Sequence, residues 1–109
     1  MNLSNSSAPE KPSENAKPWF LYLIECLDGS IYTGITVDLG ARYQAHKLGK
    51  GARYTRSHPP QKLLGAQEFP DRSTASKAEF QIKKLSPTEK RQFAMQLDPK
   101  LLPAAGNIL

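Results

Sequence analysis

Two short apolar stretches separated by a glycine-containing turn constrain the fold of this chain more than any other feature. The first stretch runs from Phe20 to Ile24, the second runs from Ile31 to Ile35, and Asp28-Gly29-Ser30 lies between them. Apolar runs of this length joined by Asp-Gly are typical of a β-hairpin. Because the first run is apolar without alternation, we expect its strand to be buried on both faces of a small sheet.

The length of the turn decides which side chains of the hairpin share a face. If the loop has two residues, Glu25 lies opposite Tyr32, and Tyr22 faces the other side of the sheet. A three-residue loop, from Asp28 to Ser30, instead places Cys26 opposite Tyr32. We favour the longer loop because it brings the two tyrosines, ten residues apart, onto one face. The residues on that face would be Tyr22, Ile24, Cys26, Tyr32 and Gly34.

A helix, a loop and a third strand are expected after the hairpin. Asp38 is a suitable N-cap for a helix that ends near Gly49. Arg42 and His46 are four residues apart in this helix, so they share one face. A basic loop from Lys50 to Pro60 follows, and then a strand over about residues 62 to 69.

Two further helices complete the ordered part. Ser73 or Thr74 is expected to cap the first, which sets Glu79 at the edge of an apolar stripe where an unpaired charge is unfavourable. The segment from Ser86 to Glu89 is a capping box with proline at the first helical position, and it begins the last helix.

The two ends of the chain differ from its middle in amino-acid composition. Residues 1–18 are mostly small, polar or charged, so we expect a disordered N-terminal tail, one domain over residues 19–97, and a C-terminal tail over residues 98–109. No segment has the ~20 apolar residues of a membrane span, and the N-terminus lacks the apolar core of a signal peptide. We expect a cytoplasmic protein that does not associate with membranes.

The inventory of metal-binding and redox-active side chains is small. The one cysteine, Cys26, excludes an internal disulfide, and its place in an apolar strand favours a buried, inert thiol. With only two histidines, the chain has too few nitrogen and sulfur ligands for a structural zinc site. Any metal would therefore be held by oxygen atoms.

Basic side chains gather in one stretch that has no acidic residue. The net charge is +5, and residues 39–67 contain no Asp or Glu. The basic residues there are Arg42, Lys47, Lys50, Arg53, Arg56 and Lys62. Such a stretch beside tyrosines is what the phosphate backbone of a nucleic acid attracts. A solvated basic surface explains the same composition equally well.

Several side chains have the chemistry needed to hydrolyse a phosphodiester. Arg42 can pair with a phosphate through its planar guanidinium, and Glu79 can hold Mg²⁺ together with water and phosphate oxygens. A tyrosine, or His46 with an ordinary pKa of ~6.5, could take the proton from water. Each residue also has a simpler interpretation as packing or as exposed surface, and only their joint order and spacing indicate a site.

That order and spacing resemble the GIY-YIG endonuclease superfamily. Phe20-Leu21-Tyr22 precedes Tyr32-Thr33-Gly34 by ten residues, as the two motifs that name the superfamily do. The resemblance covers residues 19 to about 92 and continues through Arg42, His46, Gly51 to Arg56 and Glu79. The small stand-alone members of the YhbQ type, which consist of this one domain, are the most similar.

The resemblance implies an α+β fold, with a three-stranded antiparallel sheet packed with helices, and Mg²⁺- or Mn²⁺-dependent cleavage of DNA. In that family the tyrosine matching Tyr32 is proposed as general base or water-positioning group, helped by the one matching Tyr22. The match of Arg42 contacts the scissile phosphate, and the match of Glu79 binds the metal. His46 stands where some branches carry tyrosine.

Further residues are expected to contact the nucleic acid, which is DNA or, as an alternative, RNA. They are Gly34, Lys50, Arg53, Tyr54, Thr55, Arg56 and Lys62. We expect an endonuclease that is structure-selective or of low sequence specificity and acts in DNA repair or processing. The alternatives are a module that binds nucleic acid without cutting it, and a subunit that receives its specificity from a partner protein.

Three features depart from the family pattern. The first motif begins with Phe20-Leu21 rather than Gly-Ile, Ile35 stands where repair-type members often have lysine, and no residue matches the late asparagine of some branches. These departures concern the rate and the details of the mechanism more than the fold.

Overall fold

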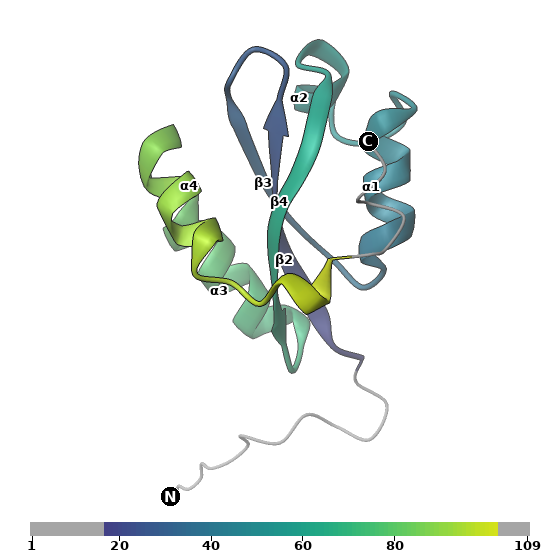
Figure 1. Ribbon diagram of the computed structural model, residues 1–109. Helices are drawn as coiled ribbons and strands as arrows, with labels where there is room; N and C mark the ends of the chain where they lie inside the picture. Colours follow the sequence, from purple (N-terminus) through teal and green to yellow (C-terminus); the bar gives the residue numbers. More distant parts are fainter. Residues whose placement is uncertain (1–16, 103–109) are drawn as a thin grey trace, which may run out of the picture.

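The computed structural model describes residues 17–102 and contains a three-stranded antiparallel sheet between two layers of helices (Figure 1). β2 (Trp19–Cys26) is the central strand, and β3 (Ile31–Thr36) and β4 (Pro60–Phe69) are its neighbours. The predicted α+β class is therefore confirmed. The continuous apolar run forms the central strand, as expected for a strand that is covered on both faces.

The hairpin loop has three residues, as predicted, but they are not the predicted ones. The loop runs from Leu27 to Gly29 rather than from Asp28 to Ser30. The Cys26 N–H donates to the carbonyl oxygen of Ser30 at 2.9 Å, and Gly29 has a φ of 87°. This is the usual geometry of a three-residue hairpin loop that closes on a left-handed glycine.

The register of the hairpin is consequently shifted by two residues. Ile24, rather than Cys26, lies opposite Tyr32, and Tyr22 lies opposite Gly34. A shift of two residues leaves every side chain on the same face of the sheet, because the side-chain period of a strand is two. The prediction that the two tyrosines share a face is therefore confirmed.

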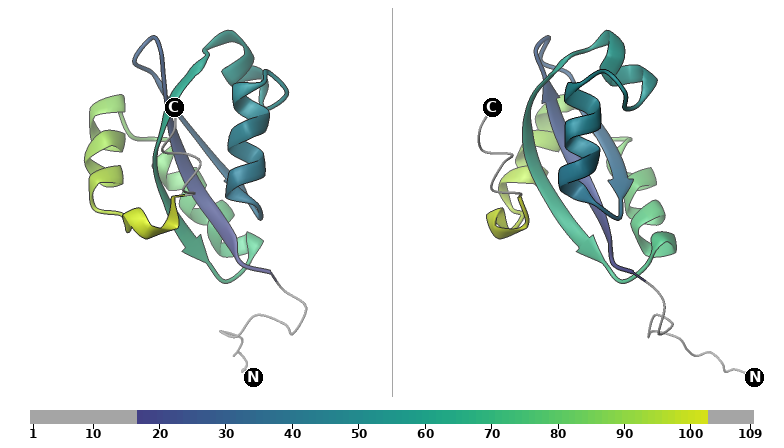
Figure 2. Two further views of the ribbon diagram at one scale, coloured as in Figure 1. Left: turned by 45° about the vertical axis from the view of Figure 1, so that its right-hand side comes forward. Right: turned by 90° about the vertical axis from the view of Figure 1, so that its right-hand side faces the viewer.

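α1 (Leu39–Lys47) and α2 (Arg53–Ser57) lie on one side of the sheet (Figure 2). Asp38 caps α1 as predicted, since its Oδ1 accepts from the Ala41 N–H at 3.0 Å. α2 lies within the segment that we expected to be a loop. A helix of one turn has too few residues to show an apolar period, so the sequence pattern does not reveal it.

α3 (Arg72–Ile82) and α4 (Pro87–Met95) lie on the opposite side of the sheet (Figure 1). The predicted cap of α3 was wrong, because Asp71 rather than Ser73 or Thr74 accepts the capping hydrogen bond, from the Thr74 N–H at 2.9 Å. The predicted capping box at the start of α4 is confirmed.

Each side of the sheet has its own core. The core beneath α1 consists of Tyr22, Ile24, Cys26, Leu39, Tyr43, Leu63 and Ala66. The core beneath α3 and α4 is built on Leu21, Leu23 and Ile31, with Ile35, Leu64, Phe69, Ala78, Ile82, Phe93 and Leu97 packed against them. Alternate residues of the central strand thus supply the two cores.

The chain continues beyond α4 as the short 3₁₀ helix η1 (Pro99–Leu101). Leu101 and Leu102 pack against the core beneath α1, so the segment after α4 passes from one side of the sheet to the other and contacts β4. The predicted tails lie outside the described residues except for residues 17–18 and 98–102. Of the helices in residues 17–102, none has the length and apolar character needed to span a bilayer.

Candidate active site

Three buried side chains form a hydrogen-bonded chain that links β2, α1 and α2. The Tyr22 hydroxyl lies 2.8 Å from Nε2 of His46, and Nδ1 of His46 lies 2.6 Å from Oγ1 of Thr55. The Thr55 hydroxyl donates to the Ala52 carbonyl oxygen at 3.0 Å, so its oxygen accepts from the His46 Nδ1–H. We therefore assign the proton of His46 to Nδ1, which leaves Nε2 to accept the Tyr22 O–H.

Burial keeps Tyr22 and His46 neutral at physiological pH. Desolvation, together with the positive charge of nearby Arg42, lowers the pKa of His46 to about 4. Desolvation also raises the pKa of Tyr22 above its usual value, although Arg42 opposes this. His46 is only 1% exposed. The hydrogen bond to His46 therefore fixes the orientation of Tyr22. His46 itself is unsuited to accept a proton, because its pKa is low and its ring is not accessible to solvent.

Tyr32 is the partly exposed phenol beside this chain. Its ring centroid lies 6.1 Å from that of Tyr22 and 5.1 Å from that of His46. Because the hydroxyl hydrogen of Tyr22 is directed to His46, the oxygen of Tyr22 remains able to accept a hydrogen bond. Tyr32 is thus the phenol of the pair that a bound molecule can reach.

α2 is attached to the hairpin by an aromatic stack. The Tyr54 ring stacks on Tyr32 with centroids 5.9 Å apart, and His58 stacks on Tyr54 at 4.0 Å. Nδ1 of His58 in turn lies 2.6 Å from Oδ2 of Asp28 in the hairpin loop. Hydrogen bonds from Ser30 and His58 hold the pKa of Asp28 well below its usual value. These contacts keep α2 and Thr55 in place next to His46.

Two glycines provide the space that this arrangement needs. A Cβ atom at Gly34 would lie 2.6 Å from the Tyr22 hydroxyl oxygen, and a Cβ atom at Gly51 would overlap the His46 ring. Gly34 is buried, so it supports the packing of the phenols rather than contacting nucleic acid as predicted. Gly51 was not among the predicted site residues, and its position at the start of the Gly-Ala-Arg-Tyr segment is the signal that could have identified it.

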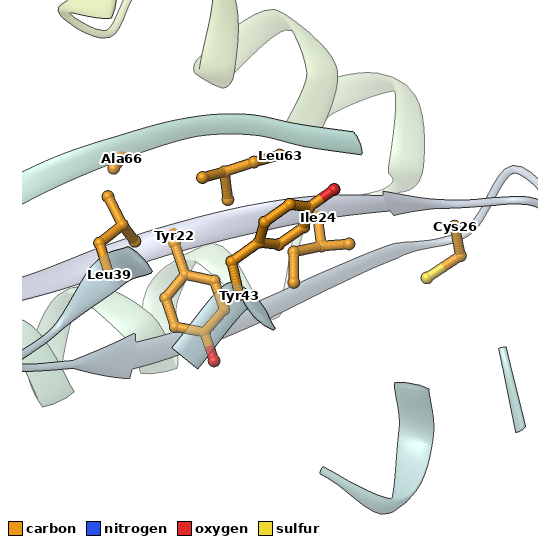
Figure 3. Close-up of a cluster of buried hydrophobic side chains, with 7 residues drawn as sticks. All are labelled: Tyr22, Ile24, Cys26, Leu39, Tyr43, Leu63 and Ala66. Atoms are coloured by element: carbon orange, nitrogen blue, oxygen red, sulfur yellow. The ribbon is translucent and has the colours of Figure 1, made fainter. Parts of the chain in front are cut away.

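Tyr22 also belongs to the core beneath α1, where a second buried phenol serves as a comparison (Figure 3). The hydroxyl groups of Tyr22 and Tyr43 point in different directions in that view. Within the described part of the chain the Tyr43 hydroxyl has no hydrogen-bond partner, and burial raises its pKa to about 12. Only Tyr22 is therefore held by a polar partner.

The basic residues predicted to bind nucleic acid do not all lie together. Lys50 follows α1, and Arg53 and Arg56 lie on α2 beside Tyr54; all three basic side chains are exposed. Lys62 is on β4, which is the edge strand on the other side of β2 from Tyr32.

The prediction for Thr55 needs a correction. Its side chain is 2% exposed and its hydroxyl is engaged by His46 and Ala52, so it cannot contact a nucleic acid. Its role in this structure is to orient His46.

Glu79 lies on α3, on the opposite side of the sheet from α1. Its side chain is 21% exposed, and its Oε2 lies 3.2 Å from Nζ of Lys83. Within residues 17–102 no hydrogen bond or ion pair joins Glu79 to the tyrosines. Lys83, however, lines a cavity of about 450 Å³ together with Tyr32 and Tyr54. Glu79 thus pairs with a residue that lines this cavity and is not itself among the lining residues.

Few acidic residues are available to hold a metal ion. In the described residues no three His, Cys, Asp or Glu side chains gather as a ligand set. Mg²⁺ commonly takes only one or two protein carboxylates and completes its coordination with water and phosphate oxygens. A single carboxylate is therefore compatible with a hard divalent cation that is held jointly with a phosphate.

The chain is similar to a known domain family and to several known proteins. Residues 18–92 match the GIY-YIG catalytic domain. A UPF0213 protein of Cupriavidus necator is 54% identical over 86 residues, which cover 79% of this chain and 92% of that protein. The UPF0213 protein YhbQ of Escherichia coli is 42% identical over 79 residues, which cover 72% and 79% of the two chains.

A solved structure supports the same relationship. The solution NMR structure of the protein EF2693 from E. faecalis has 38% sequence identity and a TM-score of 0.50, covering 73% of this chain and 85% of that one. The matched residues contain both tyrosines of the hairpin, Arg42 and His46 on α1, and Glu79 on α3. With the domain match spanning the whole sheet and these side chains, the chain belongs to the GIY-YIG catalytic domain family and, within it, to the small UPF0213 proteins.

Proposed function

We propose that this protein is a metal-dependent endonuclease that hydrolyses phosphodiester bonds in DNA. The observation that carries the proposal is the setting of Tyr32, a partly exposed phenol beside Tyr22, whose own hydroxyl is fixed by buried His46. The other buried phenol of this core, Tyr43, has no such partner among the described residues. Membership of the GIY-YIG family supports the class of reaction.

The side chains would divide the work as follows. Arg42 pairs with the scissile phosphate through its planar guanidinium and stabilises the charge that develops there. Tyr32 would orient the attacking water. Tyr22, whose own hydrogen is directed to His46, would accept a hydrogen bond from the Tyr32 hydroxyl. A divalent cation held by Glu79, Mg²⁺ or Mn²⁺, would supply positive charge at the phosphate and make a water more acidic.

The exposed basic side chains favour recognition of the shape of DNA over recognition of its sequence. Three exposed basic residues lie at the end of α1 and on α2: Lys50, Arg53 and Arg56. The partly exposed ring of Tyr32 lies next to α2, since it stacks on Tyr54. Contacts from lysine and arginine to phosphates position a duplex but carry no sequence information. We therefore propose a structure-selective or low-specificity enzyme, with DNA repair or processing as its setting.

A module that binds nucleic acid without cutting it is the second candidate, and a subunit that is directed by a partner protein belongs to the same class. One observation favours this class: the carboxylate of Glu79 is paired with Lys83, and within residues 17–102 no hydrogen bond joins it to a tyrosine. A divalent cation would have to compete with Lys83 for that carboxylate.

Cleavage of nicked and branched DNA in the presence of Mg²⁺ or of EDTA tests the proposal, with an RNA of the same sequence as a parallel substrate. We expect cation-dependent cleavage of DNA by the parent protein. Glu79→Gln should abolish cleavage and leave DNA affinity within about twofold, because the amide keeps the shape but loses the charge that holds the ion. Glu68→Gln, an exposed residue of β4, is the matched control and should cut at the parental rate.

The outcomes separate the candidates. Full activity of Glu79→Gln would remove Glu79 from the site, and equal cleavage in EDTA would exclude the cation. Tight binding of DNA without cleavage of any substrate would favour the binding module.

A further inference from the structure

The cavity at the outer edge of β3 contains groups that the proposed cleavage reaction does not use. Its volume of about 450 Å³ is within the range of small-ligand sites. Its lining combines an apolar wall, two tyrosines and two lysines: Ile31, Tyr32, Thr33, Tyr54, Lys83, Pro87 and Lys90. Because β3 is an edge strand, residues from both of its faces reach this cavity.

The two lysines hold like charges near each other. Lys90 is partly buried, and its Nζ donates to the Ile31 carbonyl oxygen at 3.2 Å. Burial and the charge of Lys83 both lower the pKa of Lys90. An ammonium group has three donors, and this hydrogen bond uses one. Lys83 is paired with Oε2 of Glu79 at 3.2 Å, which likewise uses one of its three donors. An anion between the two lysines would accept the remaining hydrogen bonds of both.

The rest of the lining suits a flat, partly apolar group. Tyr54 is 38% exposed, and stacking contacts with Tyr32 and His58 hold its ring in place. Pro87 and Ile31 supply further apolar surface. A nucleotide combines the two features that this lining would recognise, namely an anionic phosphate and a ring with an apolar face.

We propose that this cavity binds a single nucleotide, with its phosphate between Lys83 and Lys90 and its sugar and base against Tyr54 and Pro87. The placement along a DNA strand rests on the proposed function: since Tyr32 lines the cavity and also belongs to the reaction site, the bound nucleotide is the neighbour of the scissile phosphate. The cavity then selects DNA in which one nucleotide can leave the stack, as at a nick, branch or end.

Titration of the ¹⁵N-labelled full-length protein with dAMP in the presence of EDTA tests this site without any cleavage. We expect shift changes concentrated at residues 31–33, at Lys83 and at Lys90, and weaker effects of deoxyadenosine or inorganic phosphate alone. Lys83→Gln and Lys90→Gln should each raise the Kd for dAMP about tenfold, because each removes a charge-assisted contact. Lys84→Gln is the matched control and should bind like the parent, since Lys84 lies over the Phe80 ring and does not line the cavity.

Three results would overturn the proposal: an unchanged Kd in Lys83→Gln, shift changes confined to α1 and α2, or equal effects of inorganic phosphate and dAMP. Lys90→Gln also loses a bond to the sheet edge, so the dispersion of its spectrum is recorded, and Lys83→Gln decides the matter if that variant is misfolded. If the protein bound dAMP but cut no DNA, the nucleotide site would be supported and the proposed nuclease function would be contradicted. If the protein cut DNA with a divalent cation but did not bind dAMP, the nuclease function would be supported and the nucleotide site would be contradicted.

Discussion

The two faces of the sheet differ in chemistry although they share the central strand. Beneath α3 and α4, Leu21 and Leu23 pack into an aliphatic and aromatic core. Beneath α1, Tyr22 and its neighbours place a phenol, an imidazole and a hydroxyl in a hydrogen-bonded chain. The alternation of side chains along one strand therefore separates residues that stabilise the fold from residues that arrange the site. The two groups should respond differently to substitution.

The largest effect on stability is expected on the face of the sheet beneath α3 and α4, which we call the aliphatic face. Leu23 is fully buried, so Leu23→Ala should lower the free energy of unfolding by about 2–5 kcal/mol, measured by urea denaturation. The cleavage rate per folded molecule should stay at the parental value. Tyr22→Phe, one residue away on the other face, should cost less stability and most of the activity. If the two variants lost stability and activity in the same proportion, the separation of the faces would be wrong.

The second effect is a dependence of stability on pH that belongs to the polar face. The pKa of His46 is about 4 in the folded protein against 6.5 in the unfolded chain. Because the unfolded state binds the proton more tightly, the stability contributed by neutral His46 is complete above pH 6.5. It is lost as the pH falls toward 4, by about 3 kcal/mol at most.

Urea denaturation at pH 7.5, 5.5 and 4 measures this loss. His46→Gln should flatten the dependence in that range, while Asp28, whose pKa is lowered from 3.8, acts only at more acidic pH. An equal slope in His46→Gln would assign the dependence to other groups.

The third effect concerns Arg42 on α1. If Arg42 grips the scissile phosphate with its planar guanidinium, lysine replaces the charge but not the geometry. Arg42→Lys should therefore slow single-turnover cleavage on the order of 10²-fold with little change in affinity. Combination with Tyr32→Phe should be less than additive, since both groups serve one transition state. Arg72→Lys, exposed at the start of α3 and outside the site, is the control. Parental cleavage by Arg42→Lys would reduce Arg42 to a surface cation.

The smallest effect comes from the aliphatic face. The hydroxyl of Thr33 is buried there without a hydrogen-bond partner among the described residues. Thr33→Val keeps the shape and removes the unsatisfied group, so the free energy of unfolding should rise by about 1 kcal/mol. The urea midpoint measures this change. A loss of stability would mean that the hydroxyl has a partner, such as a bound water.

The sequence predicted much of the local structure because local rules govern it. The caps at Asp38 and Ser86 were identified from residue type and spacing, and Arg42 and His46 share a helix face because they are four residues apart. The register of the hairpin was predicted two residues out, yet the shared face of Tyr22 and Tyr32 was correct because parity alone decides it. The helix α2 was missed, since one turn carries no period.

By itself the sequence determined the order of the strands and the longer helices, the burial of the apolar strand on both faces and the face on which the tyrosines meet, because each depends on periodicity or on neighbouring residues. Only the tertiary structure decided that Thr55 orients His46, that burial keeps His46 neutral, and that Lys83 pairs with Glu79 beside a cavity. These properties arise from contacts between separate elements and from the loss of water around them. Neither the contacts nor the desolvation has a fixed spacing in the chain, so no local pattern records them.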